Sequence, residues 1–324
     1  MARTPLLMTG GMMPLIEEQL DQAFEVHRLH KASDRDALIR EVGPTIEAVC
    51  TGGHTGVKVN DALMNSLPKL RIVGNFGVGY DSVDAAAAGA RGIIVTNTPD
   101  VLTEEVADTT LGLLLMTVRE LPQAERWLRA GKWAKDGDYR LTPGSLRDRS
   151  VGILGMGRIG KAIARRCEAF GMPVSYCTRR QQADLSYPYY PNVVELAKAV
   201  DTLIVITPGG AETKNIINAE VLAALGPRGV LINIARGSCV DEAALITALK
   251  ERTILAAGLD VFVNEPNVNP EFLALDNVVL LPHVGSASVY TRDKMGQLVV
   301  DNLKAYAART APLTPVSETP FKGW

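Results

Sequence analysis

The chain has 324 residues, of which 47% are hydrophobic and 22% charged, and its formal net charge is −2. This length allows two domains, because single cores rarely grow beyond about 250–300 residues, and the ordinary composition excludes a disordered or fibrous chain. The near-neutral charge argues against nucleic-acid and membrane-surface partners, and no apolar run approaches the roughly 18 residues that span a bilayer.

The N-terminus favours a cytoplasmic protein, because its short apolar piece is broken by Gly10, Gly11 and Pro14 and is followed by acidic residues. A signal peptide would still be apolar there. The four cysteines form no Cys-x-x-Cys pair and have no histidine at metal-ligand spacing. We therefore expect small core residues, with no disulfide, structural zinc or other metal site.

Short apolar runs alternate with helical patterns in the first hundred residues. A helix is predicted over 34–42 with Ser33 as its N-cap, and a second over 59–67, ending before Pro68. Such alternation is typical of a parallel sheet covered by helices on both faces. The strands are expected at 6–8, 24–29, 46–50, 70–74 and 93–96.

A longer helix is predicted from Thr103, since an acidic first turn precedes a long apolar block. A polar arm follows to residue 149, with Trp127 and Trp133 as its large apolar residues. The two indoles either form a subunit interface or pack on their own domain, and both interpretations stay open. A second doubly wound sheet is expected from six further strands, at 151–157, 173–177, 202–207, 229–235, 255–261 and 277–283.

A glycine motif lies between the first of these strands and an amphipathic helix: Gly155, Gly157 and Gly160 have G-x-G-x-x-G spacing. The first glycine permits a tight turn, the second lets the backbone approach a pyrophosphate, and the third lets helix and strand pack closely. The helix N-terminus, with Arg158 and Ile159, offers N–H groups to the phosphates. This context predicts a dinucleotide site.

The end of the next strand indicates which dinucleotide is bound. An NAD site expects Asp or Glu about 20 residues after the motif, and Thr178, Arg179 and Arg180 stand there instead. A carboxylate would repel a 2′-phosphate, whereas guanidinium groups bind one. We therefore predict NADPH as cofactor, with weaker use of NADH; a solvated pair of loop arginines is the alternative.

Three ionisable residues follow apolar strands of the second sheet, namely Arg236, Glu265 and His283. Ligands of open parallel sheets bind outside the carboxyl ends of the strands. Each residue alone has an ordinary structural explanation. Together they suit hydride transfer to a keto acid: histidine exchanges a proton near neutrality, glutamate holds the imidazolium, and arginine binds a carboxylate.

Six segments occur in a characteristic order and spacing: NFGVGYDSVD (75–84), VTNTPDVLTEEVADTTLGLLL (95–115), VGILGMGRIG (151–160), NIARGSCVDE (233–242), GLDVFVNEP (258–266) and LPHVGSAS (281–288). Through these segments the chain resembles the D-isomer-specific 2-hydroxyacid dehydrogenases over nearly its whole length, in particular glyoxylate and hydroxypyruvate reductases and plant hydroxyphenylpyruvate reductases. The resemblance implies that His283 protonates the carbonyl oxygen, Glu265 orients the histidine, and Arg236 binds the keto acid. The backbone N–H groups of Val78 and Gly79 would bind its carboxylate.

The resemblance also implies a domain organisation and a homodimer. A flavodoxin-like substrate domain (1–99 plus 287–324) and a Rossmann nucleotide-binding domain (100–286) would enclose a cleft. Asp260 would hold the nicotinamide carboxamide, and the other residues lining the cofactor cleft would be Val205, Thr207, Ile234, Ala235 and Gly285. The implied reaction is NADPH-dependent reduction of small 2-keto acids, glyoxylate and hydroxypyruvate, to the D-2-hydroxy acids glycolate and D-glycerate.

Two alternative functions stay open. A reductase of bulkier keto acids, such as hydroxyphenylpyruvate or 2-ketogluconate, would use the same catalytic residues, and the loop at 51–55, with His54, does not reveal the size of the pocket. A nucleotide-sensing regulator shares this fold but is expected to carry extended tails and peptide-binding adaptations. Turnover of NADPH with a keto acid separates an enzyme from a regulator.

Overall fold

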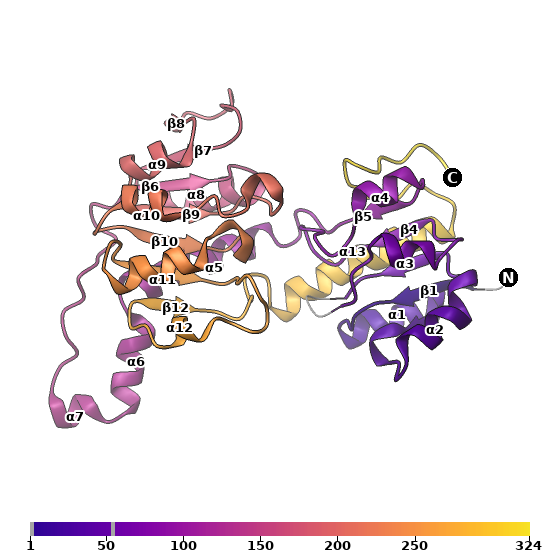
Figure 1. Ribbon diagram of the computed structural model, residues 1–324, viewed down its shortest axis with the longest axis horizontal. Coiled ribbons are helices and arrows are strands. Elements are labelled where there is room, and N and C mark those ends of the chain that lie inside the picture. The colour runs from indigo at the N-terminus through magenta and orange to yellow at the C-terminus, as the bar shows by residue number, and fades with distance from the viewer. Residues whose placement is uncertain (1–2, 53–55) are drawn as a thin grey trace. The chain divides into compact units, whose positions relative to one another are not determined.

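The computed structural model describes residues 3–52 and 56–324, which form two compact units (Figure 1). Unit 1 comprises Met1–Leu102 and Ser288–Trp324, and unit 2 comprises Thr103–Ala287. Each unit contains one sheet whose strands are all parallel. The predicted fold class, two parallel-sheet α/β domains, is confirmed.

The sheet of unit 1 has the strand order β2-β1-β3-β4-β5. The order reverses between β1 and β3, which is the doubly wound arrangement that binds ligands at the carboxyl ends of its strands. The last residues of four strands are in register, Met8 with Cys50, Cys50 with Gly74, and Gly74 with Thr96. The strands are β1 (Thr4–Met8), β2 (Phe24–Arg28), β3 (Ala48–Cys50), β4 (Ile72–Gly74) and β5 (Ile94–Thr96).

Helices cover both faces of this sheet. On one face α1 (Pro14–Ala23) packs against α13 (Val289–Ala307), which also contacts β4. The other face buries an apolar cluster that includes Leu7, Val49 and Val73. The helices contributing to that cluster are α2 (Arg35–Val42), α3 (Asp61–Asn65) and α4 (Ala85–Ala90), and short 3-10 turns follow β2 and α2 at Leu29–Lys31 and Gly43–Thr45.

Two predicted details of unit 1 are wrong. Helix α2 is capped by Asp34 rather than Ser33, and the Asp34 carboxylate accepts the Ala37 N–H at 2.9 Å. A carboxylate at this position also interacts favourably with the helix dipole. Helix α3 is shorter than 59–67, because Asn60 caps it and Val59 forms a parallel bridge with Val83 instead.

The sheet of unit 2 has seven strands in the order β12-β11-β10-β9-β6-β7-β8, one strand more than predicted. The additional strand, β8 (Tyr189–Tyr190), pairs with β7 and is too short to show a hydrophobic period. The strand order reverses between β6 and β9, which makes this edge the expected ligand site. The other strands are β6 (Val151–Leu154), β7 (Val174–Cys177), β9 (Thr202–Val205), β10 (Val230–Asn233), β11 (Ala256–Leu259) and β12 (Val278–Leu280).

Two apolar clusters cover the two faces of this sheet. One is formed with α5 (Thr103–Val118) and α8 (Arg158–Ala169). The other is formed with α9 (Val193–Ala199), α10 (Ala219–Leu225) and α11 (Glu242–Lys250), and α12 (Pro270–Leu273) precedes β12. Helix α5 begins at Thr103 as predicted, and its buried residues recur at the three- and four-residue spacing of one broad helix face.

The arm of unit 2 begins with α6 (Leu121–Arg129) and α7 (Lys132–Asp136), which project from the sheet (Figure 1). The Trp127 indole packs edge-on against Tyr139, and its N–H donates to the Gly137 carbonyl at 3.2 Å. Trp133, by contrast, is 59% exposed. Trp127 therefore packs within its own arm, whereas the apolar surface of Trp133 stays accessible in this chain.

Among the described residues, none of the helices combines the length and the apolar character required to cross a bilayer. The four cysteines are buried free thiols. Burial raises the pKa of Cys50 and Cys167 to about 12, so both are protonated and unreactive near neutral pH.

Candidate active site

The glycine motif forms the turn between β6 and α8. Gly155 has a φ of +105°, and a Cβ there would lie 2.8 Å from the Ile206 carbonyl oxygen. A Cβ on Gly160 would lie 2.1 Å from the Gly155 carbonyl oxygen, whereas one on Gly157 would meet no atom within 4 Å. Gly155 and Gly160 are therefore required by packing, and Gly157 leaves open space at the N-terminus of α8. This arrangement fits the pyrophosphate of a dinucleotide.

The segment after β7 carries two exposed arginines and no acidic side chain between residues 178 and 182. The Thr178 hydroxyl donates to the Arg180 carbonyl oxygen at 2.7 Å, which fixes the turn of the segment. Arg179 forms an ion pair with Glu212 of a 3-10 turn (Ala211–Thr213) at 3.5 Å. Both side chains of this pair are largely exposed, so it contributes little and leaves Arg179 able to bind a ligand phosphate.

The predicted wall of the cofactor cleft lies at the carboxyl edge of the same sheet. Val205 ends β9, and Ile234 and Ala235 follow β10. These three side chains are buried, as is Gly285, and Thr207 is half-buried. Gly285 is tightly placed, because a Cβ there would lie 3.0 Å from the Asp260 carboxylate.

Asp260 is buried immediately after β11 and binds the backbone of the loop that carries His283. Its carboxylate accepts the N–H groups of Val284 at 2.7 Å and Gly285 at 2.8 Å. Its carbonyl oxygen accepts the N–H of His283, a residue with a φ of +55°. Burial raises the pKa of Asp260, although the backbone hydrogen bonds oppose that shift. The structure thus gives Asp260 a loop-anchoring contact that sequence reasoning missed.

The structure brings Glu265 and His283 together, although they are 18 residues apart in sequence. His283 Nδ1 lies 2.7 Å from Glu265 Oε2, and the two side chains are 21% and 26% exposed. Glu265 Oε1 accepts the N–H of Phe262 at 2.9 Å, which fixes the carboxylate. Glu242, a residue missed by sequence reasoning, holds the same loop by accepting the Val263 N–H at 2.8 Å. Nε2 is then the ring nitrogen on the side away from Glu265.

Arg236 follows β10 at the same sheet edge as Glu265 and His283. Asn233 shapes the turn before it, donating to the Arg236 carbonyl oxygen at 3.0 Å and accepting the Ala235 N–H at 3.1 Å. The Arg236 guanidinium donates to the Ala235 carbonyl oxygen at 2.6 Å, and the side chain is half-buried. The edge therefore carries a carboxylate–imidazole pair and a guanidinium.

In unit 1, the loop that includes Val78 and Gly79 follows β4. Two asparagines bind its carbonyl groups, Asn75 those of Gly77 and Gly79, and Asn97 that of Val78. Sequence reasoning missed both asparagines. Of the loop at 51–55, His54 lies outside the described residues.

The model of the NAD-binding domain of D-isomer specific 2-hydroxyacid dehydrogenases matches residues 111–285. Among curated proteins, a glyoxylate/hydroxypyruvate reductase of Arabidopsis thaliana is 45% identical, covering 96% of this chain and 98% of that protein. A hydroxyphenylpyruvate reductase of Plectranthus scutellarioides is 46% identical over the same shares of the two chains. The chain belongs to the D-isomer-specific 2-hydroxyacid dehydrogenase family.

A solved structure extends the likeness of this dehydrogenase to the whole fold. It is the NADPH-dependent glyoxylate/hydroxypyruvate reductase of Sinorhizobium meliloti in complex with NADP and malonate. That protein is 54% identical, the match covers 99% of this chain and 98% of the other, and the TM-score is 0.92. The predicted family and enzyme class, an oxidoreductase acting on a CH–OH group, are confirmed.

Proposed function

We propose that this dehydrogenase uses NADPH to reduce the small 2-keto acids glyoxylate and hydroxypyruvate to glycolate and D-glycerate. The observation that carries the proposal is the 2.7 Å contact between Glu265 and His283. This pair lies at the same sheet edge as Arg236 and as the turn between β6 and α8, which fits a dinucleotide. The names of the relatives in Arabidopsis thaliana and Sinorhizobium meliloti support the choice of substrates.

The residues of unit 2 would hold the cofactor, which supplies a hydride to the carbonyl carbon when bound. Backbone groups of the turn at Gly155 and Gly157 and of the first residues of α8, Arg158 and Ile159, would bind the pyrophosphate, with Gly160 packing beneath them. Arg179 and Arg180, with Thr178, would bind the 2′-phosphate. NADH has no 2′-phosphate, so it would lack these contacts and bind more weakly. The NADP complex of the Sinorhizobium meliloti relative supports this assignment. The remaining cleft residues would be Val205, Thr207, Ile234, Ala235, Asp260 and Gly285.

His283 would donate the proton that the carbonyl oxygen gains during reduction. Its Nδ1 is held by Glu265, so the donated proton is the one on Nε2. The negative charge of Glu265 stabilises the positive charge of the imidazolium that donates the proton. Arg236 would bind the substrate carboxylate and polarise the carbonyl group, where negative charge grows in the transition state.

The two units would have different tasks. We assign substrate binding to unit 1, whose Val78 and Gly79 N–H groups would bind the carboxylate, and nucleotide binding to unit 2. The domain boundaries expected from the sequence, 1–99 plus 287–324 and 100–286, lie close to those of the two compact units, Met1–Leu102 plus Ser288–Trp324 and Thr103–Ala287.

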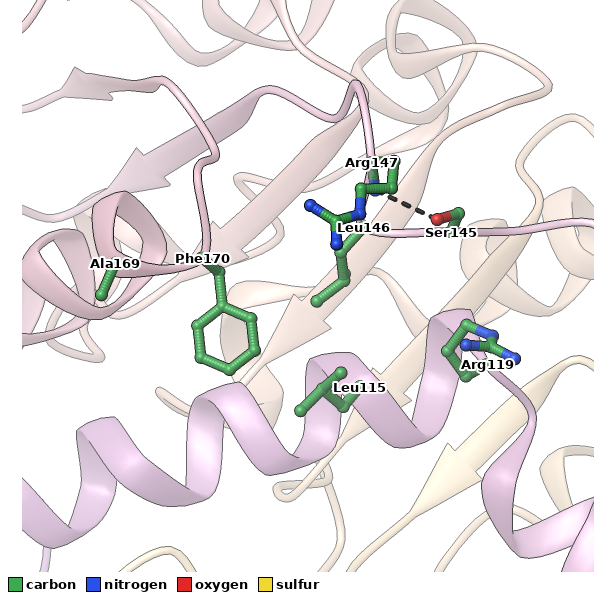
Figure 2. A pocket seen from close by; sticks show the side chains of 7 residues that line it. All are labelled: Leu115, Arg119, Ser145, Leu146, Arg147, Ala169 and Phe170. Atoms are coloured by element: carbon green, nitrogen blue, oxygen red, sulfur yellow. Dashed lines mark hydrogen bonds between the residues drawn. The ribbon is translucent and has the colours of Figure 1, made fainter.

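We also propose a homodimer in which a second copy covers the arm and the adjacent outer face of α5. Helix α6 has no buried residue, and Leu128, Trp133 and Leu141 are exposed. A hollow of about 380 Å³ lies beside α5 (Figure 2), lined by Leu115, Arg119, Ser145, Leu146, Arg147, Ala169 and Phe170. A second copy would bury the three exposed side chains of the arm and the apolar side chains of this hollow. A monomer in sedimentation at micromolar concentration contradicts this assembly.

The function is tested by initial rates of NADPH oxidation with glyoxylate, hydroxypyruvate, 2-ketogluconate, phenylpyruvate and hydroxyphenylpyruvate, each repeated with NADH. We expect the highest kcat/KM with the two small acids and with NADPH, and loss of reduction in His283→Ala. A preference for the aromatic acids would contradict the substrate class. A preference for NADH would contradict the cofactor assignment.

A further inference from the structure

The loop after β4 has three consecutive carbonyl groups that are bound by side chains of the same unit. Asn75 Nδ2 donates to the carbonyl oxygens of Gly77 at 3.2 Å and Gly79 at 3.1 Å. Asn97 Nδ2 donates to the Val78 carbonyl oxygen at 2.8 Å. The Gly77 carbonyl oxygen also accepts the Thr98 N–H at 2.9 Å.

These bonds determine where the N–H groups of the loop point. In a trans peptide the C=O and the following N–H are antiparallel, and the peptides of this loop are trans. The N–H groups of Val78, Gly79 and Tyr80 therefore point away from the asparagines that bind the carbonyls. Within residues 3–52 and 56–324, none of these three N–H groups donates a hydrogen bond. Successive unpaired N–H groups form an anion-binding concavity.

The orientation of the Asn75 amide is itself fixed. The Thr51 hydroxyl accepts the Phe76 N–H at 2.9 Å, so its own hydrogen is available for Asn75 Oδ1, 3.2 Å away. The Ser82 hydroxyl donates to the same oxygen at 3.0 Å. Asn75 is 2% exposed, so its amide nitrogen must face the two carbonyl oxygens.

Asn97 is held by the C-terminal segment of the chain. Its backbone N–H donates to the Thr314 carbonyl oxygen at 3.2 Å, and its own carbonyl oxygen accepts the Thr314 hydroxyl at 2.6 Å. Gly77 completes the loop with a φ of +151°, and a Cβ there would lie 3.0 Å from the Gly79 carbonyl oxygen. The loop conformation is thus imposed by residues from several parts of unit 1.

We propose that Asn75 and Asn97 are positioning residues of the substrate site. By binding the carbonyl groups, they turn the N–H groups of Val78, Gly79 and Tyr80 outward into a three-donor cradle for the carboxylate of the keto acid. Tyr80 thereby joins the substrate-binding residues through its backbone. The inference rests on the proposed function, which assigns the substrate carboxylate to this loop.

The first test compares Asn75→Ala and Asn97→Ala with wild type in steady-state reduction of glyoxylate. We expect each variant to raise the KM for glyoxylate tenfold or more, with the KM for NADPH changed less than twofold, because the proposed NADPH contacts belong to unit 2. Asn60→Ala is the matched control: it removes the cap of α3, whose Asn60 Oδ1 accepts the Leu63 N–H at 3.0 Å, and leaves the cradle intact. Circular dichroism verifies that each variant is folded.

The second test uses Asn75→Asp, which keeps the side-chain shape and the hydrogen bonds from Thr51 and Ser82. It replaces the amide nitrogen that donates to the loop carbonyls by an oxygen. Burial raises the pKa of such a carboxyl, and its protonated form regains one donor. We therefore expect the KM for glyoxylate, relative to wild type at the same pH, to fall as the pH is lowered. A role in stability alone predicts no such trend.

Three outcomes would overturn the inference. The first is that the KM for glyoxylate in both alanine variants is no higher than in Asn60→Ala. The second is that the KM for NADPH rises as much as the KM for glyoxylate. The third is that the KM of Asn75→Asp relative to wild type does not change with pH. Failure of the proposed function looks different, because it appears in wild type itself, as a lack of NADPH-dependent reduction of glyoxylate and hydroxypyruvate or as a preference for another substrate or cofactor.

Discussion

The Glu265→Gln substitution isolates the charge that acts on the proposed proton donor. It keeps the side-chain shape but removes the negative charge 2.7 Å from His283 Nδ1. A hydrogen bond to a charged group is worth about 1.5–3 kcal/mol, and partial exposure of both side chains places this pair in the lower part of that range. At about 1.5–2 kcal/mol, and 1.36 kcal/mol for each factor of ten, kcat/KM for reduction should fall about 10- to 30-fold near pH 7.5.

A kinetic comparison of the two proteins tests this prediction. Reduction requires a proton from His283, and the Glu265 charge stabilises the imidazolium that donates it. The assay is the initial rate of NADPH oxidation with hydroxypyruvate at pH 7.5, for wild type and for Glu265→Gln. A kcat/KM in the variant equal to that of wild type refutes the role given to Glu265.

The remaining predictions concern the cofactor, the substrate arginine and the loop anchor. Replacing Arg179 and Arg180 by Ala should raise the KM for NADPH at least tenfold while leaving NADH nearly unchanged, since each charge-assisted contact is worth about 1.5–3 kcal/mol; equal effects on both cofactors speak against a 2′-phosphate site. Arg236→Lys keeps the charge but loses the bidentate fork, so kcat/KM should still fall, and wild-type kinetics would remove Arg236 from the site. Burial raises the pKa of Asp260, so the stability of wild type relative to Asp260→Asn should be highest at low pH and decrease as the pH rises through the raised pKa. Unfolding by denaturant at several pH values measures this difference in stability. A difference that increases with pH contradicts the prediction.

The parts of the fold that were predictable from sequence have strong local signals. Most strands of both sheets are buried on two faces and read as continuous apolar runs, so their positions follow from the sequence even where their ends differ by a residue or two. The turn at Gly155 is predictable because its spacing lies between a strand and a helix. Arg236 and His283 are predictable because each follows a strand at its carboxyl end.

The missed features depend on contacts between distant segments or on small local differences. Ser33 and Asp34 are both good cap residues, and the sequence does not show which of them the helix uses. Asn75 stands next to a glycine-rich loop, but its partners Thr51 and Ser82 are brought to it only by the fold. Asp260 likewise binds a loop more than twenty residues later in the chain, which no local pattern indicates.

The central claim is most directly tested by the product formed from hydroxypyruvate and NADPH. Consumption of NADPH is followed by its absorbance, and the glycerate is quantified and resolved into its two enantiomers. We predict one D-glycerate for each NADPH consumed, with a lower rate when NADH replaces NADPH. Formation of L-glycerate, or no consumption of NADPH, would contradict the proposed reaction.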